Sequence, residues 1–176
     1  MKKSFVAITI ALLVLSVLAS TTFAAPAAAE KQVPFKGQSN GVVVTTGFED
    51  PCVSIDLNGH PCVVTFLEGE GEATHLGHFT VTDNVVVDVV TGIATGPWTL
   101  TAANGDMLFV SFVGYGIDPT HGGGDMTVVG GTGRFEGATG HYTQRITFSN
   151  TPGTLPSVSY TDVLEGVIST PGGRKQ

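Results

Sequence analysis

The sequence predicts an all-β protein whose mature part is a single antiparallel barrel, and three features carry this prediction. Val, Thr, Phe and Gly are abundant, and turn signals such as Asn58-Gly59, Asn104-Gly105 and His121 to Gly124 interrupt the chain at short intervals, as in sandwiches and barrels. No window after the first residues has a helical period, and β-branched runs such as Val85 to Val90 are disfavoured in helices. Glycines recur at inward positions of several expected strands, where barrel corners need tight bends, so a barrel is favoured over a sandwich.

The first 24 residues have the pattern of a secretory signal peptide. A short basic start precedes an almost unbroken apolar run, Phe5 to Leu18, and small residues follow as far as Ala24. The run is shorter than the stretch of about 20 apolar residues that a membrane anchor needs. We therefore expect a secreted or periplasmic protein without a membrane span. Cleavage fits best after Ala24, with two alternatives, Ala25 and Ala29.

The rest of the chain has the size of one domain, which we expect to span residues 35–170. Residues 25–34 have no periodicity and are expected to form a flexible leader, and residues 171–176 a tail. Cleavage removes Lys2 and Lys3 and no acidic residue, so the formal charge of -7 becomes -9. Such an acidic surface repels nucleic acid and anionic lipid, and neither is expected as a partner.

Cys52 and Cys62 are the only cysteines, and in an oxidising compartment a structural disulfide is their expected state. Closing a loop of this length should stabilise the fold by roughly 3 kcal/mol. A two-residue turn at Asn58-Gly59 would place Cys62 opposite Ile55 instead of Cys52. Either the loop is wider, or the bridge ties an irregular segment, which the proline before each cysteine favours.

Alternation along Gly69 to Val81 assigns residues to two faces of the expected sheet. One set of positions is small or apolar and should face inward. This phase carries His75 into the barrel and leaves His78 outside. A row of glutamates occupies the opposite set and is most simply a solvated strand face.

Met107 to Gly116 alternates in the same way, but its outward set is unusually apolar. Leu108 and Phe112 fall in the inward set. Either the outward side chains are covered in a homo-oligomer, which we favour, or a bulge changes the phase. The outward set consists of Met107, Phe109, Val113 and Tyr115.

Polar side chains also fall in the inward phase near the end of the chain. Tyr142 and Gln144 do so within Ala138 to Phe148, and Tyr160 and Asp162 do so in the last expected strand. A buried carboxyl needs a partner, and an imidazole or a tyrosine hydroxyl would serve.

Three stretches of the sequence resemble a known superfamily. The third resembles the glycine-rich hairpin of the allene oxide cyclase and dirigent barrels. The three in this order, after a signal peptide, resemble the bacterial exported relatives of that superfamily, and the resemblance covers roughly residues 35–170. The stretches are Gly71 to Gly77, Thr101 to Asp106, and Val128 to Gly140.

The resemblance implies an eight-stranded antiparallel barrel that works without a cofactor and is often trimeric in the plant members. Allene oxide cyclase isomerises an unsaturated fatty-acid epoxide within its barrel. Dirigent proteins steer the coupling of phenoxy radicals that another protein generates. The match lies in turns and framework, so no catalytic residue is carried over from it.

His75 is the first candidate for chemistry, because imidazole titrates near neutrality and can act as a pocket acid or base. Asp162 is the second candidate for a catalytic role. The alternative is that these side chains are satisfied interior polar groups. No metal site is expected, since His75 and His78 would point to opposite faces of a strand. Three further side chains would complete a ligand-binding pocket: Tyr142, Gln144 and Tyr160.

Three functions fit this pattern, and the sequence leaves open whether the protein is an enzyme. The first is an exported barrel that binds a small apolar or aromatic ligand, with cyclase- or isomerase-like chemistry on it. The second is a dirigent-like or lipocalin-like binding module without turnover. The third is a structural envelope protein with a filled barrel. An open apolar interior would separate the first two from the third.

Overall fold

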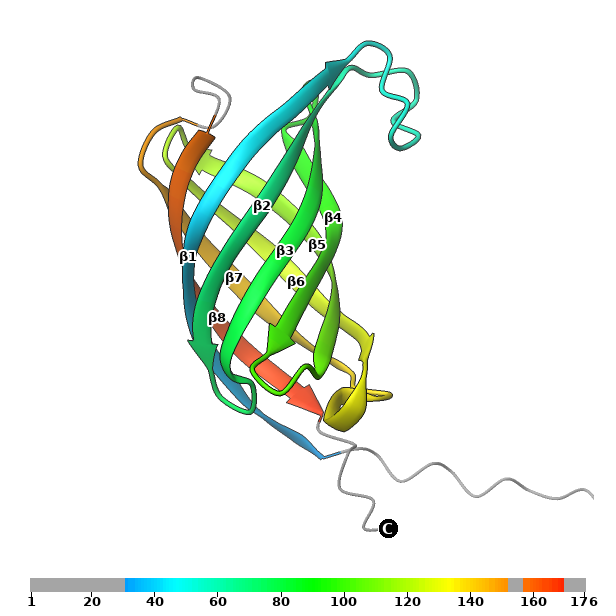
Figure 1. Cartoon of the computed structure of the whole chain (residues 1–176). Coiled ribbons are helices and arrows are strands. Elements are labelled where there is room, and N and C mark those ends of the chain that lie inside the picture. The colour runs from blue at the N-terminus through cyan, green and yellow to red at the C-terminus, as the bar shows by residue number, and fades with distance from the viewer. Residues whose placement is uncertain (1–30, 152–156, 170–176) are drawn as a thin grey trace, which may run out of the picture.

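The computed structural model of the chain describes residues 31–151 and 157–169, which form a closed antiparallel barrel (Figure 1). Each strand pairs with the next along the chain, and the last pairs with the first. The strands are β1 (Gln32–Glu49), β2 (Cys62–Ala73), β3 (Gly77–Asp88), β4 (Ile93–Ala102), β5 (Met107–Asp118), β6 (His121–Gly131), β7 (Gly140–Phe148) and β8 (Ser157–Ser169).

The predicted all-β class and the single antiparallel barrel are confirmed, as are the eight strands that the resemblance implies. The barrel begins at Gln32, inside the segment 25–34 that was expected to be a leader, because Gln32 pairs with Ser169 of β8. The expected signal peptide (1–24) and tail (171–176) lie outside the described residues. The described part of the chain has no helix long and apolar enough to cross a membrane.

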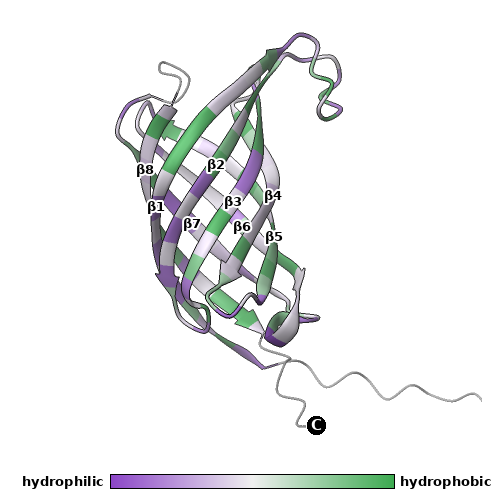
Figure 2. Cartoon of the chain, viewed as in Figure 1, coloured by the Kyte–Doolittle hydropathy of each residue, from purple (hydrophilic) through white to green (hydrophobic). Residues whose placement is uncertain are grey.

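Alternation of residue type builds the strands, and hydrophobic and hydrophilic segments alternate along them (Figure 2). In β3, Phe79, Val81 and Val85 are buried, while Thr80 and Thr82 between them are exposed. Because successive side chains of a strand point to opposite faces, the buried set fills the interior and the polar set meets solvent.

The barrel has two different ends. At the end that we call the open end lie the β1–β2 loop (50–61), the β3–β4 turn (89–92) and the β5–β6 turn (119–120). At the closed end lie the turns 74–76 and 103–106 and the 3₁₀ helix η1 (Gly133–Phe135). Figure 1 shows the β1–β2 loop projecting from one end and η1, in yellow, at the other.

Large side chains fill the closed half of the barrel. Phe35 and Tyr142 pack with their ring centroids 4.8 Å apart, and Leu76 and Phe135 are buried between the turns. Arg134 fixes this end by donating from Nη2 to the Leu76 carbonyl oxygen at 3.0 Å. The interior is therefore solid here, and any ligand space must lie in the other half.

One predicted turn is wrong. His121 to Gly124 was expected to be a turn, but these residues begin β6, and the chain reverses at Pro119 and Thr120. The glycines serve packing instead, since a Cβ at Gly124 would overlap the ring of Phe112.

Candidate functional site

An apolar cavity of about 230 Å³ occupies the open half of the barrel. An apolar cavity of roughly 150 Å³ can bind benzene, whereas pockets for drug-sized ligands run from about 300 to 1,000 Å³. The space therefore suits a compact ligand with one or two rings. Its walls include Val43, Leu67, Val85, Ala94, Trp98, Phe112, Gln144, Ile146 and Phe148.

Small residues and one packed ring keep this half unfilled. The inward positions of β4 next to Trp98 are Gly96 and Ala94, which project little into the interior. The ring of Phe112 lies over Gly114 and Gly124, in the space that a Cβ at either position would take. The ring is thereby held against the wall, and the cavity stays open.

Asp162 is the centre of a buried polar cluster. Its Oδ1 accepts hydrogen bonds from the Ser39 backbone N–H at 2.9 Å and the Ser39 hydroxyl at 2.7 Å. Its Oδ2 accepts one from Nε2 of Gln144 at 2.6 Å. Burial raises the pKa of Asp162, and these hydrogen bonds lower it in part. The structure thus places Asp162 and Gln144 inside the barrel, as predicted, with Ser39 as the partner that the sequence did not indicate.

Tyr142 and Tyr160 are also inside the barrel, as predicted. Neither hydroxyl makes a hydrogen bond of good geometry among the described residues, although the Ser39 side chain near Tyr160 lowers the pKa of that tyrosine in part. Burial, and next the charge of Asp162, raises the pKa of both tyrosines, so both stay protonated at neutral pH. Of the four predicted polar residues, Gln144 is the one that lines the cavity directly.

Asp83 and Trp98 are interior polar residues that the sequence analysis missed. They face each other across the β3–β4 pair, and each is only 2% exposed. The two carboxylate oxygens of Asp83 have no hydrogen-bond partner among the described residues. The same is true of the indole Nε1 of Trp98. The burial of Asp83 could have been predicted from the sequence, because the alternation of Phe79 and Val81 continues the inward phase of β3 to position 83.

The prediction that His75 faces the interior is wrong. His75 lies in the β2–β3 turn with φ of 68°, and its side chain is exposed. The alternation that placed it inward holds for Gly71 before the turn and Phe79 after it, but the turn between them breaks the period. This turn is at the closed end, away from the cavity, so His75 is not among the residues that could act on a ligand there.

The rim of the open end is held by the predicted disulfide and one buried carboxylate. Cys52 and Cys62 are bonded, with Cα atoms 5.2 Å apart, and they close an irregular loop that contains the Asn58-Gly59 turn. Nδ1 of His60 in this loop lies 3.0 Å from Oδ2 of Asp88. Of the two alternatives for this disulfide, the irregular segment is the one found.

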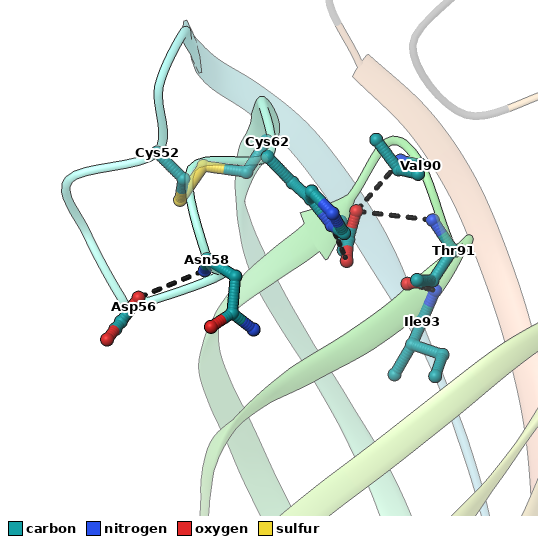
Figure 3. A network of polar contacts seen from close by, with 9 residues as sticks. Cys52, Asp56, Asn58, Cys62, Val90, Thr91 and Ile93 are labelled. Carbon is teal, nitrogen blue, oxygen red and sulfur yellow. Dashed lines mark hydrogen bonds and ion pairs between the residues drawn. A yellow bond between two sulfur atoms is a disulfide. The ribbon is translucent and has the colours of Figure 1, made fainter.

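Asp88 also organises the neighbouring β3–β4 turn. Its Oδ1 accepts hydrogen bonds from the backbone N–H groups of Val90 at 2.8 Å and Thr91 at 3.2 Å, and these two residues are drawn with their dashed contacts in Figure 3. The His60 contact, followed by these N–H donors, holds the pKa of Asp88 well below its usual range. One carboxylate therefore ties two rim segments together.

The other polar groups of the surface do not form a comparable site. A larger hollow of about 620 Å³ lies on the outer wall and is lined mainly by exposed polar side chains such as Glu70, Glu72 and His78. Ser39 and Asp162 of the buried polar cluster also form part of its lining. Among the described residues, the group of side chains that could hold a metal ion is Glu49 with Cys52 and Cys62. Both of its sulfur atoms are engaged in the disulfide and are not thiolate ligands.

Comparison with known structures identifies the architecture. The structure of the pterocarpan synthase dirigent protein GePTS1 matches with a TM-score of 0.52 and 15% sequence identity, over 84% of this chain and 90% of that one. The pterocarpan synthase dirigent protein PsPTS1 matches with a TM-score of 0.52 and 13% identity, over 80% of this chain and 96% of that one. No protein-family description and no curated protein sequence matches the chain. The chain therefore has the barrel fold of dirigent proteins.

Proposed function

We propose that this protein is an exported barrel that binds one small apolar or aromatic ligand in the open half of its interior. The observation that carries the proposal is the apolar cavity of about 230 Å³ around Trp98 and Phe112. A structural barrel gains stability by filling its interior, and this one is solid at one end and open at the other. Eight-stranded barrels of this size can hold one small ligand.

Export is part of the proposal. The basic start, apolar run and small residues of positions 1–24 support a cleaved signal peptide. The Cys52–Cys62 disulfide supports an oxidising compartment, either the periplasm or the exterior of the cell.

Two forms of the function differ in whether the ligand is transformed. In the catalytic form, the buried acid Asp162, whose hydrogen-bond partner Gln144 lines the cavity, exchanges a proton with the ligand during a cyclase- or isomerase-like reaction. In the other form the barrel only binds, as a dirigent-like or lipocalin-like module. The fold shared with pterocarpan synthase dirigent proteins supports either form. Turnover that is lost in Asp162→Asn, while ligand binding persists, selects the catalytic form.

Trp98 is the only tryptophan of the chain and lines the cavity, so its fluorescence reports occupancy. We expect 4-bromobenzyl alcohol, an uncharged one-ring compound whose bromine quenches indole emission, to quench Trp98 with a saturable curve. Ala94→Phe fills the cavity and should abolish the saturable component. The matched control is Thr161→Phe on the exposed face of β8. Linear, collisional quenching in the wild type, or saturable quenching that survives Ala94→Phe, contradicts the proposal.

We also infer that the protein self-associates, as a dimer or a trimer, through the outer face of β5. Its outward residues Met107 and Phe109 are half-buried, and Val113 and Tyr115 are 49% and 53% exposed. On β4, Ile93 pairs with Tyr115 and extends the apolar surface. A contiguous apolar face of this kind supports a protein contact.

A further inference from the structure

Asp83 is a buried acid without a hydrogen-bond partner among the described residues, and its cross-strand neighbours Leu67 and Trp98 line the cavity. A Cβ built at Gly96 would lie 2.9 Å from its Oδ1, so this oxygen occupies the inner face of β4 between Ala94 and Trp98. Both of these neighbours line the cavity. Asp83 is 2% exposed and does not itself line the cavity, so its carboxyl group lies behind the residues that do.

The empty barrel offers this acid no cation. Burial raises the pKa of Asp83 to about 8, and the nearby Asn84 N–H, which does not make a hydrogen bond of good geometry, offsets this only in part. No Lys, Arg or His side chain of the described residues is fully buried. The titratable groups on the facing elements are Tyr142 of β7 with Tyr160 and Asp162 of β8, and none of them is cationic.

One aromatic ring lies next to the acid, and a second packs against that ring. Trp98 is the cross-strand neighbour of Asp83, and the centroid of the Phe112 ring lies 5.6 Å from that of Trp98. A cation over an indole or phenyl face is attracted by about 0.5–1 kcal/mol at exposed sites and by about 2 kcal/mol or more when it is desolvated. A carboxylate beside an indole that packs on a phenyl ring is a combination that recognises an organic ammonium group.

The entrance of the cavity is negatively charged, like the ionised Asp83. Among the described residues, the segments at the open end (50–61, 89–92 and 119–120) contain no Lys or Arg. Acidic side chains of the rim bias entry toward cations and against anions. The rim acids are Glu49, Asp50, Asp56, Asp88 and Asp118.

We propose that the ligand is cationic: a compact apolar or aromatic amine whose ammonium group pairs with Asp83 and lies against the rings of Trp98 and Phe112. The proposal rests on the ligand-binding function proposed above and specifies the charge class of its ligand. Carboxylate-bearing ligands such as fatty acids are disfavoured, because they would meet only acids and neutral donors inside the barrel.

Binding releases a proton. In the empty barrel at neutral pH Asp83 is the neutral acid, because burial raises its pKa to about 8. The amine enters as the ammonium ion, the carboxyl O–H bond of Asp83 breaks, and its proton goes to solvent. The bound state contains one carboxylate and one ammonium, so charge and atoms balance.

Three compounds with the same ring test the charge class: 4-bromobenzylamine, 4-bromobenzyl alcohol and 4-bromobenzoate, each titrated at pH 7 against Trp98 fluorescence. The amine should bind roughly tenfold tighter than the alcohol, which corresponds to about 1.4 kcal/mol, and the benzoate should bind most weakly. Calorimetry in two buffers of different ionisation enthalpy should show close to one proton released per amine bound. In Asp83→Asn the preference for the amine and the proton release should both disappear.

The matched control is Asp125→Asn, which removes the same charge from the exposed outer face of β6 and should keep the preference. If the alcohol binds as tightly as the amine, or if Asp83→Asn keeps the preference, the cationic ligand is excluded while the binding barrel stands. If none of the three compounds quenches saturably, the proposed function itself fails. Should Asp83→Asn not fold, the amine-to-alcohol ratio and the proton release of the unaltered protein decide.

Discussion

At the scale of single residues, two buried acids of this barrel have opposite surroundings. Asp162 accepts three hydrogen bonds, from Ser39 and Gln144. Asp83 accepts none of good geometry. A buried carboxyl without partners is costly in its charged form, so Asp83 is the residue whose ionisation most directly opposes folding.

This difference predicts a pH effect on stability. The folded pKa of Asp83, about 8, exceeds its usual value of 3.8, so between these values the folded state binds more protons than the unfolded state. Stability therefore falls as pH rises through this window. Asp83→Asn removes the effect: urea unfolding should find the variant similar to the wild type near pH 4 and more stable at pH 8. Parallel stability curves for the two proteins would show that Asp83 is not buried in this way.

Residue placement was predictable where strands run on regularly. The inward phase of Tyr142, Gln144, Tyr160 and Asp162 follows from a period of two and is confirmed. His75 was misplaced because the same count was carried through a turn, where the backbone adopts φ of 68°. Whether a buried acid finds hydrogen-bond donors depends on the residues opposite it on the neighbouring strands. The strand register that places Ser39 opposite Asp162 cannot be read from the sequence.

At the scale of elements, Asp88 joins the β1–β2 loop to the β3–β4 turn. It contacts His60 of the loop and accepts the N–H groups of Val90 and Thr91. The disulfide closes the loop covalently, but the loop's position against β3 depends on this carboxylate. The two cysteines were enough to predict the disulfide. The contacts of Asp88 that join the loop to the turn are tertiary and have no local sequence signal.

Replacing Asp88 with Ala should therefore loosen the rim without unfolding the barrel. We expect the melting temperature to fall by several degrees, because two backbone N–H groups and an imidazole lose their acceptor. Amide hydrogen exchange should increase in both the loop and the turn. Asp56→Ala is the control, since its carboxylate accepts one N–H, from Asn58, within the exposed loop. Faster exchange confined to the turn would mean that the loop is held by other contacts.

At the scale of the whole molecule, apolar and charged side chains are distributed unevenly over the outer surface of the barrel. The outer faces of β4 and β5 carry exposed apolar side chains, including Val113 and Tyr115. Four Lys or Arg side chains lie in the described residues, and none of them is in these two strands. The sequence indicated this face correctly, because the alternation of β5 leaves apolar residues on both sides.

Self-association predicts a concentration-dependent mass. Light scattering after size exclusion should find a dimer or a trimer of the mature protein, and Val113→Lys should convert it to monomer by placing a charge in the contact. Val163→Lys is the matched control, because Val163 is exposed to a similar extent, 50% against 49%, on the far strand β8. A wild-type protein that stays monomeric at high concentration contradicts the contact.

The location of a bound ligand decides whether the open half of the barrel is a binding site. In a crystal of the mature protein soaked with 4-bromobenzyl alcohol, the anomalous signal of bromine marks the compound without reference to any model of binding. We expect one strong bromine peak inside the open half of the barrel, between Trp98, Phe112 and Ile146. A cavity filled by side chains, or bromine found only on the outer wall, would contradict it.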